Sequence, residues 1–337
     1  MTDDQTALMP KEKVEPAAET CAGVLRAMNR IILGKDELIR LTFATILAGG
    51  HALLEGLPGL GKTVLARSFA SALGVKFRRV QFTPDLLPSD ITGSYVLEEA
   101  SDGRSMRFYP GPVFTNLLLA DEINRASPKT QSALLEAMSE NQVTQMGETH
   151  PLEPPFCVLA TQNPIEMEGT YPLPEAQMDR FAVKLDVRGS DQDVLKRIIT
   201  ERKTGRPPEP SQVTDDGGLR ELQDLVHEVF LPDAIADHIS AVVSLTHSDA
   251  TDAPETVRGG VKHGASPRGA IWLAQISRAL ALMDGRPGVG FEDVRLAAPS
   301  VLGHRLILHH TARLDGLTGR DVASEVVEAS EGRLVQE

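Results

Sequence analysis

The segment GLPGLGKT, residues 56–63, constrains the fold of this chain more than any other part of the sequence. It fits the pattern G-x-x-x-x-G-K-[S/T] without a gap, and its glycines let backbone N–H groups curl around phosphate oxygens. The apolar residues HALLE (51–55) predict a short buried strand before it, and TVLARSFASALG predicts a helix after it. Strand, loop and helix therefore follow in the order that a phosphate-binding loop requires, with the positive end of the helix beside the phosphates.

The loop supplies the candidate nucleotide-binding residues. Lys62 is expected to reach the β- and γ-phosphates, and the Thr63 hydroxyl to ligate a metal ion. We therefore predict ATP and Mg²⁺ as cofactors. The full predicted set is Gly56, Pro58, Gly59, Gly61, Lys62, Thr63 and Val64.

Four more short apolar runs predict strands at residues 78–82, 116–121, 157–161 and 182–186. Helices are expected between them; one should begin at Ser127, a favourable N-cap followed by Pro128. Near-continuous apolar strands alternating with helices favour a parallel sheet covered on both faces. We expect an α/β fold with a five-stranded parallel sheet.

The remaining stretches set the expected domain organisation. Residues 1–19 are polar and are expected to form a flexible arm, residues 20–203 the α/β core, and residues 204–218 a Pro/Gly-rich linker. Residues 219–331 have helical patterns and predict a small all-helical domain, followed by a tail at 332–337. Two insertions in the core, at about 94–112 and 142–156, are predicted to be hairpins.

The apolar strand at 116–121 ends in two adjacent carboxylates. Successive side chains at a strand end point to different sides, so Asp121 can lie beside Mg²⁺ while Glu122 faces the attacking water as general base. Asn163, in ATQNP, follows another strand; its amide can hydrogen-bond both water and the γ-phosphate, or it can simply form the turn before Pro164. Asp121, Glu122 and Asn163 are thus candidate hydrolysis residues.

Composition excludes several other classes of protein. Among 337 residues, 34 are basic and 47 acidic, and the formal net charge of −13 disfavours non-specific binding to nucleic acid or anionic membranes. Cys21 and Cys157 are too few for a disulfide framework or a structural zinc site, so we expect reduced thiols in a cytoplasmic protein. No secretory signal is expected at the start, and no apolar run approaches the roughly 20 residues of a membrane-spanning helix.

Taken together, the P-loop, LLLADEINRA, ATQNP, LPEAQMDRF and GASPRG resemble the MoxR family of AAA+ ATPases over about residues 20–331. The resemblance implies a P-loop αβα core with a helical lid, working as a ring that is commonly a hexamer. It also implies that Asn163 is the sensor-1 residue, that Arg180 in MDRF is an arginine finger reaching a neighbouring subunit, and that Arg268 in ASPRG is the sensor-2 arginine. A guanidinium suits such roles because it can pair with two phosphate oxygens at once.

Two details of the resemblance leave questions open. Gly269 stands where the family pattern usually has Ala, and Arg125 in DEINRA has either an interface or a phosphate-contacting role. The two hairpins are what the resemblance implies for the branch shared with magnesium-chelatase motors and MCM helicases, in which they approach the central channel or the client.

Three functions follow as hypotheses. The first is a chaperone-like motor that remodels or activates a partner, which in the MoxR family is often a von Willebrand factor A domain protein acting with its client enzyme, sometimes in metal or cofactor insertion. The second is an MCM-like nucleic-acid translocase, which predicts basic or aromatic hairpin tips. The segments EEASDGRS and MGET at the expected tips are acidic or neutral and favour the first. A small-molecule kinase, the third, does not account for Arg180, the lid or the hairpins.

Overall fold

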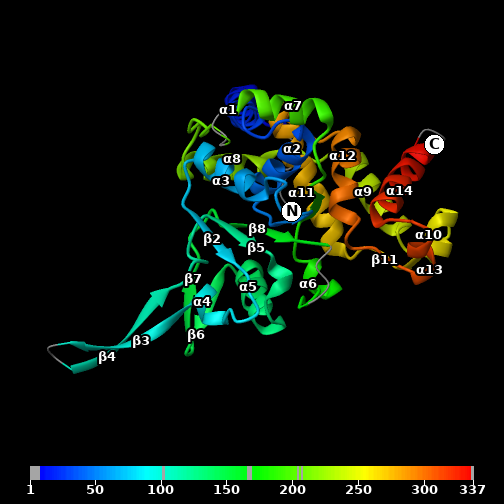
Figure 1. Ribbon diagram of the computed structural model, residues 1–337. Coiled ribbons are helices and arrows are strands. Elements are labelled where there is room, and N and C mark those ends of the chain that lie inside the picture. Colours follow the sequence, from blue (N-terminus) through cyan, green and yellow to red (C-terminus); the bar gives the residue numbers. More distant parts are fainter. Residues whose placement is uncertain (1–7, 101–102, 165–168, 203–204, 206–207, 335–337) are drawn as a thin grey trace, which may run out of the picture.

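The computed structural model describes residues 8–100, 103–164, 169–202, 205 and 208–334. Its centre is a five-stranded sheet in the order β2-β5-β8-β1-β9, with every neighbouring pair parallel (Figure 1). The strands are β1 (Ala52–Glu55), β2 (Phe77–Gln81), β5 (Leu117–Asp121), β8 (Cys157–Gln162) and β9 (Val183–Asp186). The predicted five-stranded parallel sheet is confirmed.

Alternation along the strands builds a separate core on each face of the sheet. In β5, Leu117 and Leu119 belong to one buried cluster, whereas Leu118 and Ala120 belong to the other. Helices α1 (Lys11–Asn29), α2 (Asp36–Leu47) and α3 (Lys62–Ala72) contribute to the first cluster, and α4 (Pro88–Thr92) and α5 (Pro128–Glu140) to the second. Both faces are covered, as parallel strands require.

The expectation of a flexible arm over residues 1–19 is wrong for residues 11–19, which form the first half of α1. Val14, Ala17, Cys21 and Val24 are buried and recur at helical spacing, so they form an apolar stripe that packs against the core and lid. Residues 1–7 lie outside the described part of the chain.

The two insertions form antiparallel hairpins. β3 (Gly93–Ala100) pairs with β4 (Gly103–Pro110) and extends from the body of the molecule, and β6 (Gln142–Gln145) pairs with β7 (Glu148–Pro151) (Figure 1). The hairpins contact each other: the His150 ring stacks on Phe108 with centroids 3.9 Å apart, and the Tyr95 hydroxyl donates to Glu148. The insertions therefore form one connected unit beside the sheet.

The C-terminal part of the chain is the lid. The core ends with α6 (Glu175–Met178) and α7 (Gln192–Glu201). The next helix, α8, begins at Asp216, so its first residues fall within the linker expected at 204–218. A short antiparallel pair, β10 (Val261–His263) with β11 (Ile307–Leu308), adds to the expected helices. The lid helices are α8 (Asp216–Glu228), α9 (Asp233–Leu245), α10 (Glu255–Gly260), α11 (Pro267–Met283), α12 (Phe291–Leu302), α13 (His310–Leu314) and α14 (Gly319–Leu334).

The lid shares a continuous hydrophobic cluster with the core. Helix α11 lies at the centre of the lid and packs against α1 and α2. Among the helices that the structure describes, none is long and apolar enough to cross a membrane.

Candidate active site

The phosphate-binding loop connects β1 to α3 at the carboxyl end of the sheet. Gly59 and Gly61 have φ angles of 83° and 87°, a left-handed conformation that glycine adopts without a steric penalty. The loop borders a cavity of about 350 Å³, whose other walls come from β2, from the end of β5 with the residue after it, and from the residue directly after β8. The cavity is lined by Pro58, Gly59, Leu60, Gly61, Lys62, Thr63, Val64, Arg79, Gln81, Asp121, Glu122 and Asn163.

Gly56 is the one predicted loop residue that does not line this cavity. A Cβ atom at Gly56 would lie 2.5 Å from the Val187 carbonyl oxygen, so glycine is needed for the close approach of two backbones. Glycine at this position allows the start of the loop to pass close to the backbone that follows β9.

Lys62 lies at the start of α3 and points back over the loop. Its Nζ donates to the carbonyl oxygens of Gly56 and Leu57, the latter at 3.0 Å. Burial lowers the pKa of the Lys62 ammonium, while the charges of Asp121 and Glu122 act in the opposite direction. The ammonium group thus interacts electrostatically with both carboxylates.

Asp121 ends β5, and its carboxylate is fixed at both oxygens. Oδ1 accepts a hydrogen bond from the Thr161 hydroxyl at 2.6 Å, and Oδ2 accepts from Arg79 Nη2 at 2.7 Å and Nε at 3.1 Å. The residue is only 8% exposed, so these donors compensate a buried negative charge.

Glu122 follows directly in a left-handed conformation, with φ 57° and ψ 51°. This conformation is uncommon for a residue with a side chain and is concentrated at functional sites. Its N–H donates to Thr161 Oγ1 at 2.8 Å, and its Oε2 accepts from Gln81 Nε2 at 2.7 Å and from Arg125 Nη1 at 2.9 Å. Thr161 therefore holds both acidic residues through one hydroxyl group.

Asn163 completes the cavity from the end of β8. It is 6% exposed, and its carbonyl oxygen lies 3.4 Å from the donating Asn124 Nδ2. The structure thus brings Lys62, Thr63, Asp121, Glu122 and Asn163 to one cavity.

The residues present fit a magnesium ion. Thr63 and Asp121 offer a hydroxyl and a carboxylate oxygen to the same cavity, and Mg²⁺ is commonly held by one or two such protein ligands together with phosphate oxygens and water. Within the described ranges, no group of three or more His, Cys, Asp and Glu side chains could form a metal site from protein ligands alone.

Arg180 and Arg268 are not brought to this cavity. Arg180 follows α6, and its Nη1 donates to the Leu135 carbonyl at 2.7 Å and to Ser139 Oγ at 2.5 Å. Arg268 lies in the first turn of α11, is half-exposed, and pairs with Asp179 at 3.3 Å. Within this chain, both guanidinium groups therefore make contacts away from the phosphate-binding loop.

Arg305 is an important residue at the junction of core and lid that sequence reasoning missed. Its buried guanidinium donates to Asp179 Oδ1 at 2.8 Å and to the Phe181 carbonyl at 2.7 Å, tying the lid to the segment after α6. A Cβ at Gly269 would lie 3.2 Å from Arg305 Cδ, so glycine at this position makes room for that side chain. This contact gives a physical reason for Gly269 in the chain.

Arg79, Gln81 and Thr161 were also missed as parts of the site. A signal existed for the first two: in residues 78–82, Arg79 and Gln81 alternate with the apolar Val80 and Phe82, which places both on one side of β2. Nothing local in the sequence indicates that this side faces Asp121 and Glu122, because the pairing of β2 with β5 joins distant segments.

Comparison with known proteins agrees with the geometry. Residues 51–183 match the model of the ATPase family associated with various cellular activities (AAA), and residues 255–326 match an AAA lid domain. The crystal structure of a protein from Cytophaga hutchinsonii, assigned as an ATPase, superposes with a TM-score of 0.86 at 36% identity, covering 94% of this chain and 96% of that one.

Full-length relatives extend the match to nearly the whole chain. Chaperone MoxR1 of Mycobacterium tuberculosis is 42% identical over 89% of this chain and 79% of its own length, and the uncharacterized protein YeaC of Bacillus subtilis is 41% identical over 90% and 91%. Protein MoxR of Paracoccus denitrificans is 33% identical over 84% of this chain and 87% of its own. With its parallel sheet, phosphate-binding loop and lid, this chain belongs to the MoxR family of AAA+ ATPases.

Proposed function

We propose that this chain is a Mg²⁺-dependent ATPase that works as a ring, commonly a hexamer in its family, and remodels or activates a partner protein in the cytoplasm. The observation that carries the proposal is that the candidate residues lie in two different places. The loop, both carboxylates and Asn163 meet at one cavity, whereas Arg180 and Arg268 lie outside it. Because Arg180 lies outside the cavity of its own chain, it is suited to stabilise the charge that develops during phosphoryl transfer at the site of a neighbouring subunit.

Lys62, Thr63, Asp121, Glu122 and Asn163 are each suited to a distinct part of hydrolysis. Lys62 is suited to bind the β- and γ-phosphates, and Asn163 to orient the attacking water. Glu122 is suited to accept the proton of that water. Bound between Thr63, Asp121 and the phosphates, Mg²⁺ would neutralise phosphate charge. Arg180 of a neighbouring subunit would supply the positive charge in trans.

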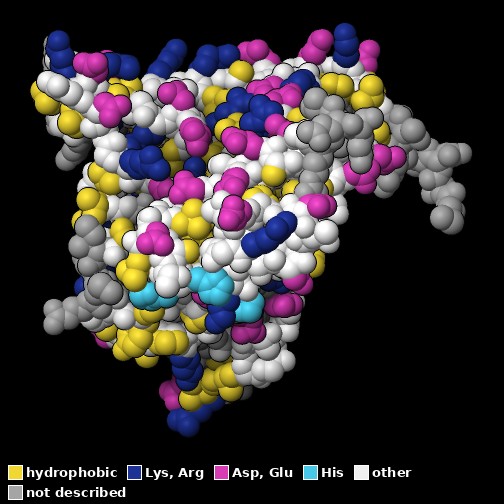
Figure 2. All heavy atoms as spheres, turned by 90° about the vertical axis from the view of Figure 1, so that its right-hand side faces the viewer, with side chains coloured by type: hydrophobic (Ala, Val, Ile, Leu, Met, Phe, Trp, Pro, Cys, Tyr) yellow, Lys and Arg dark blue, Asp and Glu magenta, His cyan; other side chains and the backbone are white. Residues whose placement is uncertain are grey.

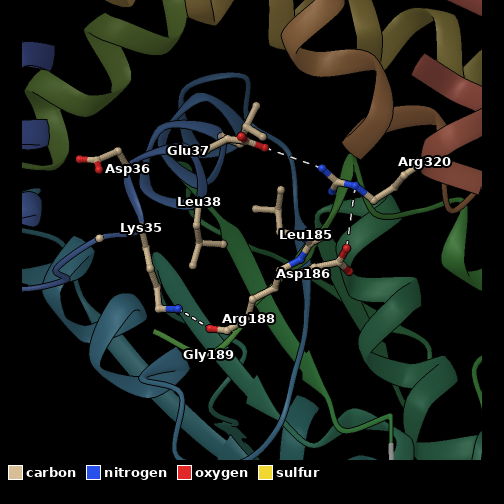
Figure 3. Close-up of a pocket in the computed structure, with 11 residues that line it drawn as sticks. Lys35, Asp36, Glu37, Leu38, Leu185, Asp186, Arg188, Gly189 and Arg320 are labelled. Atoms are coloured by element: carbon tan, nitrogen blue, oxygen red, sulfur yellow. Dashed lines mark hydrogen bonds and ion pairs between the residues drawn. The ribbon is translucent and has the colours of Figure 1, made fainter. Parts of the chain in front are cut away.

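A second cavity is suited to the nucleoside end of ATP. It measures about 330 Å³ and lies between the start of α2, the end of β9 with the residues that follow it, and Arg320 of the lid (Figure 3). Leu38, Leu41 and Leu185 supply apolar walls for a planar base. Arg320 of α14 reaches across the opening to Glu37 at 3.7 Å and to Asp186 at 3.8 Å, so a ligand there would touch the lid as well as the core.

The hairpins favour a protein partner over nucleic acid. On β3 and β4, Arg104 pairs with Glu99 at 2.9 Å and Arg107 with Glu98 at 3.7 Å, which offsets the positive charge that phosphates would require. Exposed apolar side chains accompany them, namely Val96, Leu97, Met106 and Tyr109. On the face in Figure 2, acidic and basic side chains are interspersed. These features support the chaperone-like function, for which one relative is named, over an MCM-like translocase.

A substrate-trapping experiment tests this function. Glu122→Gln protein, held with ATP in lysate of its own organism, is captured and its bound material identified by mass spectrometry and nucleic-acid staining, with Lys62→Ala as the matched control that should not bind ATP. We expect ATP-dependent enrichment of a protein, in particular one with a von Willebrand factor A domain and its client enzyme. Nuclease-sensitive nucleic acid without a protein partner would support the translocase instead.

A further inference from the structure

We infer that Arg79 competes with magnesium for Oδ2 of the Asp121 carboxylate, so that Arg79 must leave this oxygen when the metal ion of a metal–nucleotide complex binds there. The inference rests on the Mg²⁺-dependent ATPase proposed above. It identifies Arg79 as a residue that determines how much Mg²⁺ is needed to strengthen nucleotide binding.

The geometry at Asp121 is the first observation. Arg79 donates two hydrogen bonds, from Nη2 at 2.7 Å and Nε at 3.1 Å, and both go to Oδ2. Thr161 donates to Oδ1 at 2.6 Å. Two N–H donors occupy the acceptor positions of Oδ2, so a metal ion can use that oxygen only after the guanidinium moves.

Burial and charge give the direction of the competition. The Asp121 side chain is 11% exposed and needs a positive partner, whereas the Arg79 side chain is 45% exposed and can swing toward solvent without unpacking the core. A guanidinium and Mg²⁺ at one carboxylate also repel each other, because both are cations within a few ångströms. Arg79 therefore acts as a built-in counter-ion that the metal must replace.

Gln81 links this exchange to the second carboxylate. Arg79 Nη2 also donates to Gln81 Oε1 at 2.7 Å, and Gln81 Nε2 donates to Glu122 Oε2 at 2.7 Å. Release of Arg79 removes the partner that orients the Gln81 amide. The arrival of metal at Asp121 thus bears on the donor that holds Glu122.

A simpler role for Arg79 would be a direct contact with a nucleotide phosphate, since it lines the same cavity. The two roles predict opposite effects of its removal. A phosphate contact stabilises bound nucleotide with or without metal, whereas a competitor of the metal weakens only the metal-dependent part of binding.

The test is a magnesium titration with the full chain and a fluorescent, non-hydrolysable ATP analogue. Nucleotide affinity is measured in EDTA and over a range of Mg²⁺ for the wild type, Arg79→Met and Arg78→Met. Arg78 is an exposed neighbour on β2 that does not line the cavity, so its substitution removes the same charge without touching Asp121. Arg79→Gln serves as a second variant if Arg79→Met fails to fold.

We expect Arg79→Met to lower the Mg²⁺ concentration at half-maximal enhancement by about ten-fold, the size of one lost charge-assisted hydrogen bond. Affinity in EDTA should stay within about two-fold of the wild type on the same reasoning, and Arg78→Met should behave as the wild type. Weaker binding of Arg79→Met both in EDTA and in Mg²⁺ would overturn the inference in favour of a phosphate contact. An unchanged half-maximal Mg²⁺ concentration would overturn it as well.

Asp121→Asn separates failure of this inference from failure of the proposed metal site. If Mg²⁺ strengthens nucleotide binding in the wild type and Asp121→Asn loses that effect, the metal site stands and the Arg79 result decides the competition alone. If Mg²⁺ has no effect on any of the proteins, the proposed Mg²⁺-dependent function fails first.

Discussion

At the residue scale, the proposed chemistry depends most on Glu122. Its carboxylate is held at the cavity by donors from Gln81 and Arg125, beside the loop that would hold the phosphates. Replacing it with Gln keeps the shape of the side chain but removes the ability to take a proton from water. We expect Glu122→Gln to bind ATP and to lose hydrolysis by roughly 10²- to 10⁴-fold, as for loss of a general base.

Steady-state phosphate release together with equilibrium nucleotide binding checks this prediction. Lys62→Ala is the matched comparison, because it should lose tight ATP binding itself. Hydrolysis by Glu122→Gln at the wild-type rate would remove Glu122 from the mechanism.

The sequence predicted the site only where its residues belong to local patterns. Lys62, Thr63, Asp121, Glu122 and Asn163 lie in or directly after strand–loop motifs, and the structure brings them to one cavity. Arg79 and Thr161 reach Asp121 only because β2 and β8 both pair with β5, and such long-range pairing leaves no local signal.

At the scale of elements, His51, which directly precedes β1, connects this strand to β8 and α5 by hydrogen bonds. Val158 N–H donates to its Nδ1 at 3.0 Å, and its Nε2 lies 3.1 Å from the Met138 carbonyl, so the neutral ring satisfies both contacts. Burial lowers the pKa of His51 from 6.5 to about 4. Protonation would place a second N–H against the Val158 donor.

The sign of the resulting pH dependence follows from linkage. Below pH 6.5 the unfolded chain takes up a proton at His51, while the folded chain does so only near pH 4. The free energy of unfolding therefore falls as the pH is lowered from 6.5 to about 4. The expected loss from this residue is on the order of 3 kcal/mol. We expect chemical denaturation at several pH values to show a shallower decline for His51→Gln than for the wild type; parallel curves would contradict the assignment.

Helix α1 gives a second prediction at this scale. Val14 is 2% exposed in the segment that its composition led us to expect as a flexible arm, while the neighbouring Glu15 is exposed. Val14→Ala should lower the free energy of unfolding by about 1–3 kcal/mol, through lost apolar burial and a cavity. Glu15→Ala should change it by less than about 0.5 kcal/mol. Equal small effects of both substitutions in denaturant melts would show that residues 11–19 do not pack against the core.

Local signals also explain which elements were predictable. The Ser127 side chain caps α5 and Pro128 opens it, as the sequence predicted. In α1, the charged residues and Pro16 dominate the composition, although the apolar residues that face α3 and α11 recur at helical spacing and were a local signal of this helix. Composition alone therefore misjudged this segment.

At the scale of the whole molecule, the lid and core are joined by both apolar packing and buried charge. The Arg305 side chain is 1% exposed and pairs with Asp179 of the core, which also contacts Arg268 of α11. Arg305 and Arg268 thus tie the lid to Asp179, the residue that directly precedes Arg180 in the chain.

The central claim is that the active site is completed by Arg180 of another subunit, and subunit mixing tests it most directly. Arg180→Ala protein retains the loop and Glu122, while Lys62→Ala protein retains Arg180, so each should be inactive alone. Mixed rings, verified by native mass spectrometry, should recover part of the wild-type hydrolysis because some sites combine an intact loop with an intact Arg180. Absence of any recovery in mixed rings that demonstrably form would contradict a site shared between subunits.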